Sequence, residues 1–384
     1  MSSTSKLAEF AARVCGVIRA FTNAAELPAE SAPTFDHLAL ELFGLQFEQN
    51  VAYGRFCGAR RARPENVAHW KAIPAVPANA FKEWELSCLR REERSTVFHS
   101  SGTTGQRPSR HFHNGASLEV YEASLLGWFG AQFPMANGKW QMADRLEGGW
   151  QMAVLTPPPA QAPHSSLVHM FETIRRELGA GEASFVGKVA EDGGWSLELE
   201  AAVKLLGKAS AARRPLLLPG TAFSFVHLLD YLAERGLRFA LAPGSCALET
   251  GGYKGRSRAL PKQTLHALIS QRLGIPQDHI ICEYGMSELS SQAYDWATGT
   301  EPAARHASRC FRFPPWARVQ IISPETGCEV GDGETGLIRI FDLANVWSVM
   351  AIQTEDLGVR QGDGFTLAGR AVRAEPRGCS LMAV

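Results

Sequence analysis

The sequence predicts an α/β protein in which layered sheets are flanked by helices and a β-rich subdomain follows towards the C-terminal end. The chain has 384 residues, of which 45% are hydrophobic, enough for a large buried core. Through its middle, short apolar runs bounded by turn residues alternate with helix-like segments, a pattern typical of α/β layers. From about residue 316, the faces of the predicted strands alternate, as they do in a hairpin.

The pattern of residues 1–80 predicts a helical lead-in to the core. Apolar residues recur there at helical spacing: Leu7, Phe10, Val14, Ile18, and then Leu40, Phe43, Phe47 and Val51. Charged residues such as Glu9 and Arg13 interrupt the first set, which is unlike the apolar core of a secretory signal. No run approaches the ~18 apolar residues of a membrane-spanning helix. We therefore expect a cytoplasmic protein with no membrane span.

Residues 81–315 are expected to form the α/β core. Four apolar runs are typical of buried strands: 152–155, 216–218, 239–241 and 280–281. Two helices are predicted between them: 223–235 and 262–273. Each helix ends beside a glycine, Gly236 or Gly274, which is a common stop signal.

Residues 316–370 are expected to form the β-rich subdomain. Segments 319–322 and 337–340 predict a hairpin, with a turn at 324–327 after the first of them. The remaining residues, 371–384, make a short tail that carries Cys379.

Charge and cysteine content exclude several classes of protein. The chain has 39 basic and 39 acidic residues and no dense basic run, so no nucleic-acid partner is indicated. Eight cysteines are scattered without a C-x-x-C pair, which argues against a structural zinc site. In a reducing cytosol they are expected to be free thiols.

The segment Ser100-Ser101-Gly102-Thr103-Thr104-Gly105 indicates a loop that binds phosphate. Glycines free the backbone N–H groups to point at an anion, and the hydroxyls add further donors. The spacing is not that of a P-loop, which needs a longer interval between its glycines and a following lysine. The alternative is an ordinary polar turn, since the same residue types make loops.

Three later segments give the loop its context. They are Tyr284-Gly285-Met286-Ser287-Glu288, Thr354-Glu355-Asp356-Leu357-Gly358 and Leu367-Ala368-Gly369-Arg370. In this order the set resembles the adenylate-forming superfamily, with its SSGTTG-type, YGxTE-type, TGDLG-type and GR-type motifs. The ending Arg377-Gly378-Cys379-Ser380-Leu381 and the glycine-rich stretch 248–254 resemble one branch, the LuxE-type acyl-protein synthetases of bacterial fatty-aldehyde pathways. The resemblance covers most of residues 80–384.

The resemblance implies the large N-terminal domain of an adenylate-forming enzyme, which joins a carboxylic acid to AMP with release of pyrophosphate. ATP and Mg²⁺ are the implied cofactors. The implied roles are phosphate binding by Ser100, Ser101, Gly102, Thr103, Thr104 and Gly105, contact with adenine by Tyr284 and Gly285, hydrogen bonding to ribose by Asp356, a phosphate-side contact by Ser287, a ribose or phosphate contact by Arg370, and Mg²⁺ binding by Glu288.

Each assignment has a plainer alternative. Tyr284 would be a half-buried aromatic residue, Glu288 a solvated residue at a helix start, and Asp356 with Arg370 a surface ion pair. The chain also departs from the family pattern in two places. Glu355 stands where the TGD motif has a glycine, and Ser109-Arg110 stands where a lysine is common.

Only 14 residues follow Arg370 (384 − 370), and no lysine follows Lys262. Full-length relatives in the superfamily carry a C-terminal lid with a catalytic lysine, so this lid is expected to be absent or reduced to a short tail. In the acyl-protein synthetases, a cysteine near the C-terminus accepts the acyl group, and Cys379 occupies the matching place. Its plainer interpretation is a chance thiol in a frayed terminus.

Three functions remain open from the sequence. The first is activation of a fatty or aryl acid, transfer to Cys379 as a catalytic nucleophile, and delivery to a partner such as a reductase. The second keeps adenylation but sends the acyl group to CoA, an amine or a carrier protein, as in phenylacetate-CoA ligase-like enzymes. The third is a catalytically inactive nucleotide-binding subunit.

Overall fold

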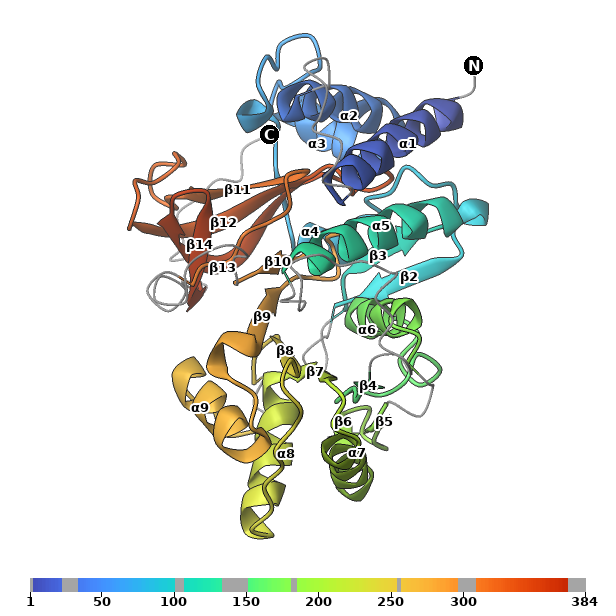
Figure 1. The fold of residues 1–384 in the computed structure, drawn as a ribbon. Helices are drawn as coiled ribbons and strands as arrows, with labels where there is room; N and C mark the ends of the chain where they lie inside the picture. Colours follow the sequence, from blue (N-terminus) through green and yellow to red (C-terminus); the bar gives the residue numbers. More distant parts are fainter. Residues whose placement is uncertain are drawn as a thin grey trace.

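The computed structural model describes residues 3–22, 34–100, 107–132, 151–180, 185–253, 257–295 and 309–371. Three regions follow one another through the chain (Figure 1): helices at the N-terminus, a central sheet with helices on both faces, and a second sheet formed mainly by the last strands. The α/β class predicted from the sequence is confirmed.

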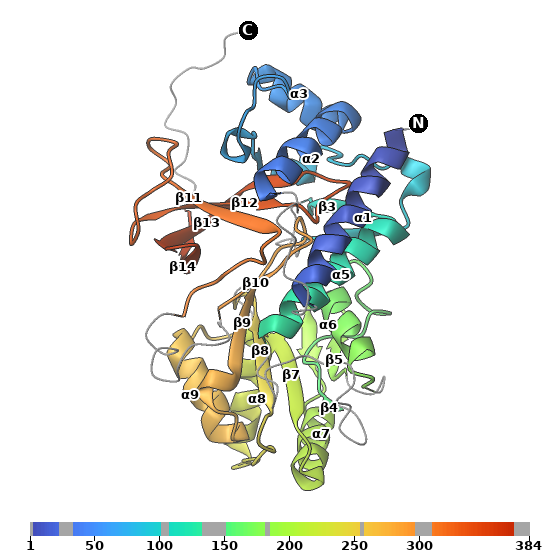
Figure 2. The ribbon, with the colours of Figure 1, turned by 45° about the horizontal axis from the view of Figure 1, so that its top comes forward.

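The N-terminal region is helical, as the periodicity predicted. It contains α1 (Ser3–Thr22), α2 (Phe35–Gln49) and α3 (Val51–Ala59). Thr34 and Asn50 cap the second and third helices, because their side chains accept hydrogen bonds from the first-turn N–H groups of His37 and Tyr53. The four apolar residues spaced along α1 are all buried, and the helix packs along α5 (Gly115–Gln132), as Figure 2 shows.

The central sheet has the order β10-β9-β8-β7-β4. Its members are β4 (Gln151–Met152), β7 (Leu216–Thr221), β8 (Cys246–Thr250), β9 (Ile280–Tyr284) and β10 (Ala293–Tyr294). The first four are parallel and β10 is antiparallel to β9. All residues of β7, β8 and β9 are buried, as expected for parallel strands covered on both faces.

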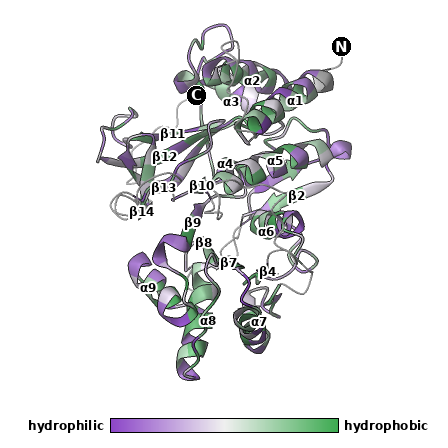
Figure 3. Ribbon diagram, viewed as in Figure 1, coloured by the Kyte–Doolittle hydropathy of each residue, from purple (hydrophilic) through white to green (hydrophobic). Residues whose placement is uncertain are grey.

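Alternate residues of these strands enter two different cores. Leu216, Leu218 and Ala247 pack with α7 (Leu199–Ala212), α8 (Ala222–Glu234) and α9 (Lys262–Leu273). Leu217 and Leu248 pack with α5 and α6 (Ser166–Glu177) on the opposite face. Most of α8 is coloured hydrophobic in Figure 3, in agreement with its burial against the sheet.

One predicted strand is wrong. Residues 239–241 form no strand: the N–H groups of Phe239 and Leu241 donate to the carbonyls of Arg272 and Leu273 at the end of α9. The strand lies a few residues later, at β8. The cysteine, glutamate and threonine of β8 interrupt the apolar run by which a buried strand is predicted. The other predicted strands and both predicted helices are confirmed, the run 152–155 continuing beyond β4 as single bridges at Val154 and Leu155.

The second sheet has the order β1-β13-β12-β11, with β14 also paired to β13. It contains β1 (Val76–Pro77), β11 (Ala317–Ile322), β12 (Thr335–Asp342), β13 (Ala351–Gln361) and β14 (Gly364–Arg370). The predicted hairpin is confirmed as β11–β12. A single apolar core joins this sheet to the N-terminal helices, so the two ends of the described chain pack together.

Smaller elements complete the fold. Two hairpins are formed by β2 (Thr96–His99) with β3 (Arg110–His113) and by β5 (Gly187–Val189) with β6 (Trp195–Leu197). The short helices are α4 (Ala80–Glu83) and the 3-10 turns η1 (Trp70–Ala72), η2 (Arg91–Glu93) and η4 (Gln277–His279). Among the residues that the structure describes, no helix is long and apolar enough to cross a membrane, and the seven cysteines are free thiols.

Candidate active site

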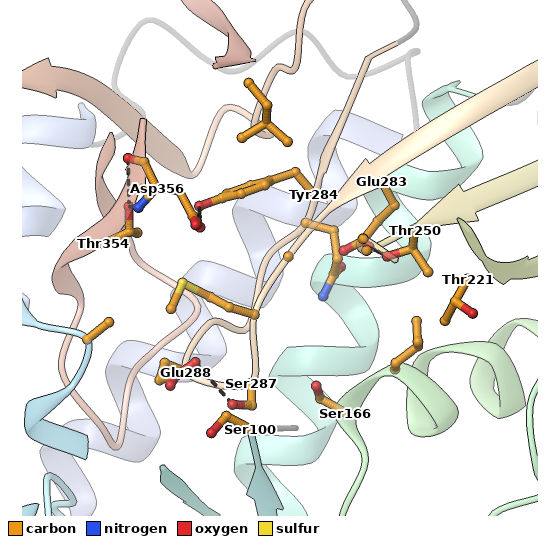
Figure 4. Close-up of a pocket in the computed structure, with 18 of the residues that line it drawn as sticks. Ser100, Ser166, Thr221, Thr250, Glu283, Tyr284, Ser287, Glu288, Thr354 and Asp356 are labelled. Carbon is orange, nitrogen blue, oxygen red and sulfur yellow. Dashed lines mark hydrogen bonds between the residues drawn. The ribbon is translucent and has the colours of Figure 1, made fainter. Parts of the chain in front are cut away.

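A cavity of about 3040 Å³ lies where β7, β8 and β9 end, beside β13 and β14. Parallel strands direct their carboxyl ends to one edge of a sheet, where α/β proteins bind ligands. The last residue of each strand lines the cavity: Thr221, Thr250 and Tyr284. Across from them, Thr354, Asp356 and Arg370 come from the second sheet. Figure 4 shows the polar side chains of this cavity.

The predicted phosphate loop begins at this cavity. Strands β2 and β3 bring the two ends of the loop together, with His99 opposite Arg110. The Ser109 N–H donates to Ser100 Oγ at 3.0 Å, and Ser109 Oγ lies 3.3 Å from Ser287 Oγ. Ser100 therefore lies beside the second motif, as Figure 4 shows. Ser101, Gly102, Thr103, Thr104 and Gly105 lie outside the described residues.

Ser287 and Glu288 form a buried hydroxyl–carboxylate pair. Ser287 Oγ donates to Glu288 Oε2 at 3.0 Å. Glu288 is 5% exposed, and its burial raises the pKa of its carboxyl above the ordinary value. It is therefore not the solvated helix-start residue of the plainer interpretation. A buried carboxylate beside hydroxyl oxygens has the donor set that Mg²⁺ prefers, so these residues fit the predicted metal.

Tyr284 ends β9 and reaches the second sheet. Its hydroxyl donates to Asp356 Oδ2 at 3.0 Å, while its ring packs against Phe311, Phe313 and Phe365. Burial, assisted by the neighbouring Asp356 carboxylate, raises the pKa of the Tyr284 hydroxyl well above its usual value. The hydroxyl is thus a hydrogen-bond donor at neutral pH, and the tyrosine links two motifs that are 72 residues apart in the chain.

The strand register sets Asp356 opposite Arg370, because β13 and β14 are antiparallel. Arg370 Nε lies 3.3 Å from Asp356 Oδ1, and the exposed fractions of the two side chains are 72% and 25%. The ion pair of the plainer interpretation is therefore present. It lies on the rim of the same cavity, so both groups can also reach a ligand there.

Glu355, which replaces the motif glycine, fits an ordinary strand. Among the described residues other than glycine, a positive φ occurs only at Arg61 and Arg213, so Glu355 has no need of glycine's freedom. Its carbonyl accepts from the Ala371 N–H at 2.9 Å, while Thr354 Oγ1 accepts from the Asp356 N–H at 3.1 Å. The departure from the family pattern leaves Asp356 at the cavity.

Glu283 was not predicted as a site residue, although it precedes Tyr284 in the motif. It is 7% exposed, and Thr250 Oγ1 donates to its Oε2. Burial raises the pKa of its carboxyl to about 7. A Cβ at Gly285 would meet the end of the Glu283 side chain, so any larger residue there would require this carboxyl group to shift. Sequence offers one signal, an acidic residue at the end of a buried strand.

Apolar side chains line the part of the cavity nearest α5, α6 and α8. They include Tyr121, Leu167, Met170 and Phe223, with Trp195 from β6. Such a surface suits the hydrocarbon part of an acid. Cys379, the predicted acyl acceptor, lies outside the described residues, as do its neighbours in the tail.

The fold is shared with a solved acyl-CoA ligase. A solved 2-hydroxyisobutyryl-CoA ligase in complex with 2-HIB-AMP superposes with a TM-score of 0.59 over 87% of this chain and 67% of that one, at 13% identity. An open form of that ligase with 2-HIB-AMP and CoA gives a TM-score of 0.58 over 90% and 79% of the two chains, also at 13% identity. At such identities the likeness concerns the fold.

The chain belongs to the acyl-protein synthetase LuxE family, whose model matches residues 182–383. Two curated relatives are long-chain-fatty-acid–luciferin-component ligases. The Aliivibrio fischeri protein is 22% identical over 327 residues, which are 84% of this chain and 78% of the relative. The Vibrio harveyi protein is 22% identical over 344 residues, 87% and 83% of the two chains. The resemblance recognised in the motifs is confirmed, and the chain is an acyl-adenylate-forming ligase of the acyl-protein synthetase type.

Proposed function

We propose that this enzyme uses ATP and Mg²⁺ to activate a fatty or aryl acid and then passes the acyl group to Cys379 and on to a partner such as a reductase. The Tyr284–Asp356 hydrogen bond carries the nucleotide part of this proposal, because it joins two motifs at one cavity. The names of the curated relatives favour a long-chain fatty acid, and the apolar part of the cavity supports that choice.

In the first step, a carboxylate oxygen of the acid attacks the α-phosphorus of ATP, and the bond to pyrophosphate breaks. Both reactants are anions, so the site must reduce their repulsion. Ser100 supplies a hydroxyl donor at the phosphate side, Ser287 lies beside it and holds Glu288 by its own hydroxyl hydrogen, and the Arg370 guanidinium supplies a fixed positive charge. Mg²⁺, held by Glu288, would neutralise phosphate charge as a Lewis acid.

The nucleoside is held from the other side of the cavity. The ring of Tyr284 offers an apolar face for adenine, and Asp356 offers carboxylate oxygens to the ribose hydroxyls. The site must also exclude water, because the acyl-AMP anhydride hydrolyses readily.

In the second step, the Cys379 thiolate attacks the acyl carbon. The bond to AMP breaks, AMP leaves, and a thioester forms. The thiol proton passes to solvent. Arg373 and Arg377, near in sequence, favour the thiolate by their positive charge.

Acid-dependent exchange of labelled pyrophosphate into ATP tests the first step. We expect exchange with long-chain acids. Asp356→Ala should raise the KM for ATP roughly ten- to hundredfold, because a hydrogen bond to a charged group contributes about 1.5–3 kcal/mol. Asp363→Ala is the matched control, since Asp363 is an exposed carboxylate paired with Arg312. ATP binding without exchange for any acid would reject activation and favour the inactive nucleotide-binding subunit.

Intact mass spectrometry after incubation with ATP, Mg²⁺ and the acid tests the second step. We expect one acyl adduct, removed by hydroxylamine and lost in Cys379→Ala. Cys328→Ala should keep the adduct, since Cys328 is an exposed cysteine of the turn after β11. An adduct that survives Cys379→Ala, or acyl-CoA formation that is indifferent to it, would reject the tail-cysteine step while leaving activation intact.

A further inference from the structure

Three metal-binding side chains converge at the wall of the cavity. Glu249 comes from β8, His266 from α9 and Cys282 from β9. Their residues are 9%, 4% and 4% exposed, respectively. Cys282 lies two positions before Tyr284, so the cluster supports the strand that carries this residue to the nucleotide side of the cavity.

The three ligand atoms surround one point. Cys282 Sγ lies 2.9 Å from Glu249 Oε2 and 3.5 Å from His266 Nε2. His266 Nε2 lies 3.4 Å from the same glutamate oxygen. In a tetrahedral zinc site, bond lengths of about 2.3 Å to sulfur and about 2.0–2.1 Å to nitrogen place these two atoms about 3.5 Å apart. The sulfur–nitrogen separation is therefore already that of a zinc site, whereas the sulfur and the glutamate oxygen, now joined by a thiol hydrogen bond, would have to move apart on binding.

The geometry does not fit a catalytic cysteine–histidine–glutamate relay. A relay needs the two ring nitrogens of histidine to contact different partners, one the nucleophile and the other the carboxylate. Here one nitrogen, Nε2, faces both Cys282 and Glu249. All three groups thus point inwards, as metal ligands do.

The surrounding charges allow a divalent ion. Lys262 and Arg309 both contact the buried Asp295. While the Cys282 thiol is protonated, the two positive charges of Lys262 and Arg309 are balanced by the two negative charges of Asp295 and Glu249. A divalent ion that displaces the thiol proton to solvent adds one net positive charge. The three ligands line the large cavity, from which an anion or a water molecule can take the fourth position.

We propose that Glu249, His266 and Cys282 bind a divalent transition-metal ion, with zinc preferred, that ties β8, α9 and β9 together behind Tyr284. Thiolate, imidazole and carboxylate are the zinc ligands of proteins, whereas Mg²⁺ prefers oxygen alone. This site is distinct from the one proposed at Glu288, and its argument rests on the cluster's geometry and not on the proposed reaction.

The test uses the full chain without a polyhistidine tag. After loading with zinc and removal of the excess, elemental analysis should find one zinc per chain. Loading with cobalt(II) should give a thiolate-to-cobalt charge-transfer band and the intense visible bands of tetrahedral cobalt. Both signals should be lost in Cys282→Ser and His266→Gln. Cys246→Ser is the matched control, because Cys246 is a buried cysteine of β8 outside the cluster, and it should keep both.

Should Cys282→Ser fail to fold, Glu249→Gln provides a second test that preserves side-chain volume. The zinc affinity of Glu249→Gln should fall at least roughly tenfold, because the loss of a group that only supports a ligand already costs that much. The zinc-dependent rise in Tm of the wild type should shrink accordingly. A wild-type chain that retains no zinc, a cobalt spectrum without the thiolate band, or a Glu249→Gln variant with unchanged affinity would overturn the proposal. None of these readouts depends on acid activation.

Discussion

The carboxyl group of Glu283 is buried and accepts a hydrogen bond from the hydroxyl of Thr250. Glu283 lies at the end of β9, beside Thr250 of the neighbouring strand. Desolvation outweighs that hydrogen bond and raises the pKa of the carboxyl to about 7. The folded protein therefore binds the proton of this group more tightly than the unfolded chain does.

A pH-dependent difference in stability between Glu283→Gln and the wild type follows. The glutamate's ordinary pKa is 4.5 and its folded value about 7. Its favourable contribution is fully present below pH 4.5 and is lost as the pH rises through 7. Glutamine has no such dependence, so the stability of Glu283→Gln relative to wild type should increase by about 3 kcal/mol across this window, at about 1.4 kcal/mol per pKa unit.

Urea unfolding at several pH values from 4.5 to 8 would measure this difference. Glu65→Gln is the control, because Glu65 lies in an exposed loop, and its curve should run parallel to that of the wild type. If the Glu283→Gln curve also ran parallel, the raised pKa would be contradicted.

Individual site residues were predictable to the extent that ordered motifs mark them. Tyr284, Asp356, Ser287 and Glu288 all lie at the cavity. The role of Glu283 depends on Thr250, which is 33 residues away in the chain. Local sequence contains no information about that partner, so the burial and the shifted pKa follow only from the fold.

At the scale of elements, periodicity predicted α1 but not the helix it contacts. The two helices approach closely at Gly127 of α5. A Cβ there would lie 2.9 Å from Ile18 Cγ2 and 3.3 Å from Thr22 Cγ2. The glycine is therefore needed for the helices to pack at this distance. The misplaced strand at 239–241 has a similar origin, because its backbone groups bond to α9 and not to a strand.

Gly127→Val should destabilise the protein by about 1–3 kcal/mol, the usual cost of overpacking a core. The loss should be smaller when measured in an Ile18→Ala background, because the shortened side chain leaves room for the valine. Gly44→Ala is the control: the nearest atom to its Cβ is 4.0 Å away, and alanine should stabilise α2 by up to ~1 kcal/mol. A double-mutant cycle in urea with no coupling between residues 18 and 127 would contradict this contact.

At the scale of the whole molecule, the site depends on how two sheets are held relative to each other. Motifs on the central sheet and motifs on the second sheet face one cavity. Parallel pairing of Val76 with Ile352 fixes the N-terminal region to β13, and the common apolar core extends that link. Sequence motifs predicted the members of the site, but their mutual placement depends on these contacts across most of the chain.

Gln46 of α2 is hydrogen-bonded to the segment between β12 and β13. Its substitution therefore measures how much the contact between the N-terminal helices and the second sheet contributes to the free energy of unfolding. Gln46 is 0% exposed, its Nε2 donates to the Asn345 carbonyl at 2.7 Å, and its Oε1 accepts from the Met350 N–H at 3.0 Å. Gln46→Leu should leave that N–H buried without a partner, at a cost of about 1–3 kcal/mol. Glu48→Ala, an exposed change on the same helix, should have little effect. Because α2 and the second sheet share one core, tryptophan fluorescence and circular dichroism should report the same lowered urea midpoint for Gln46→Leu. A midpoint equal to that of the wild type would show that the N-terminal helices do not hold the second sheet in place. Two separate transitions in the wild type would show the same.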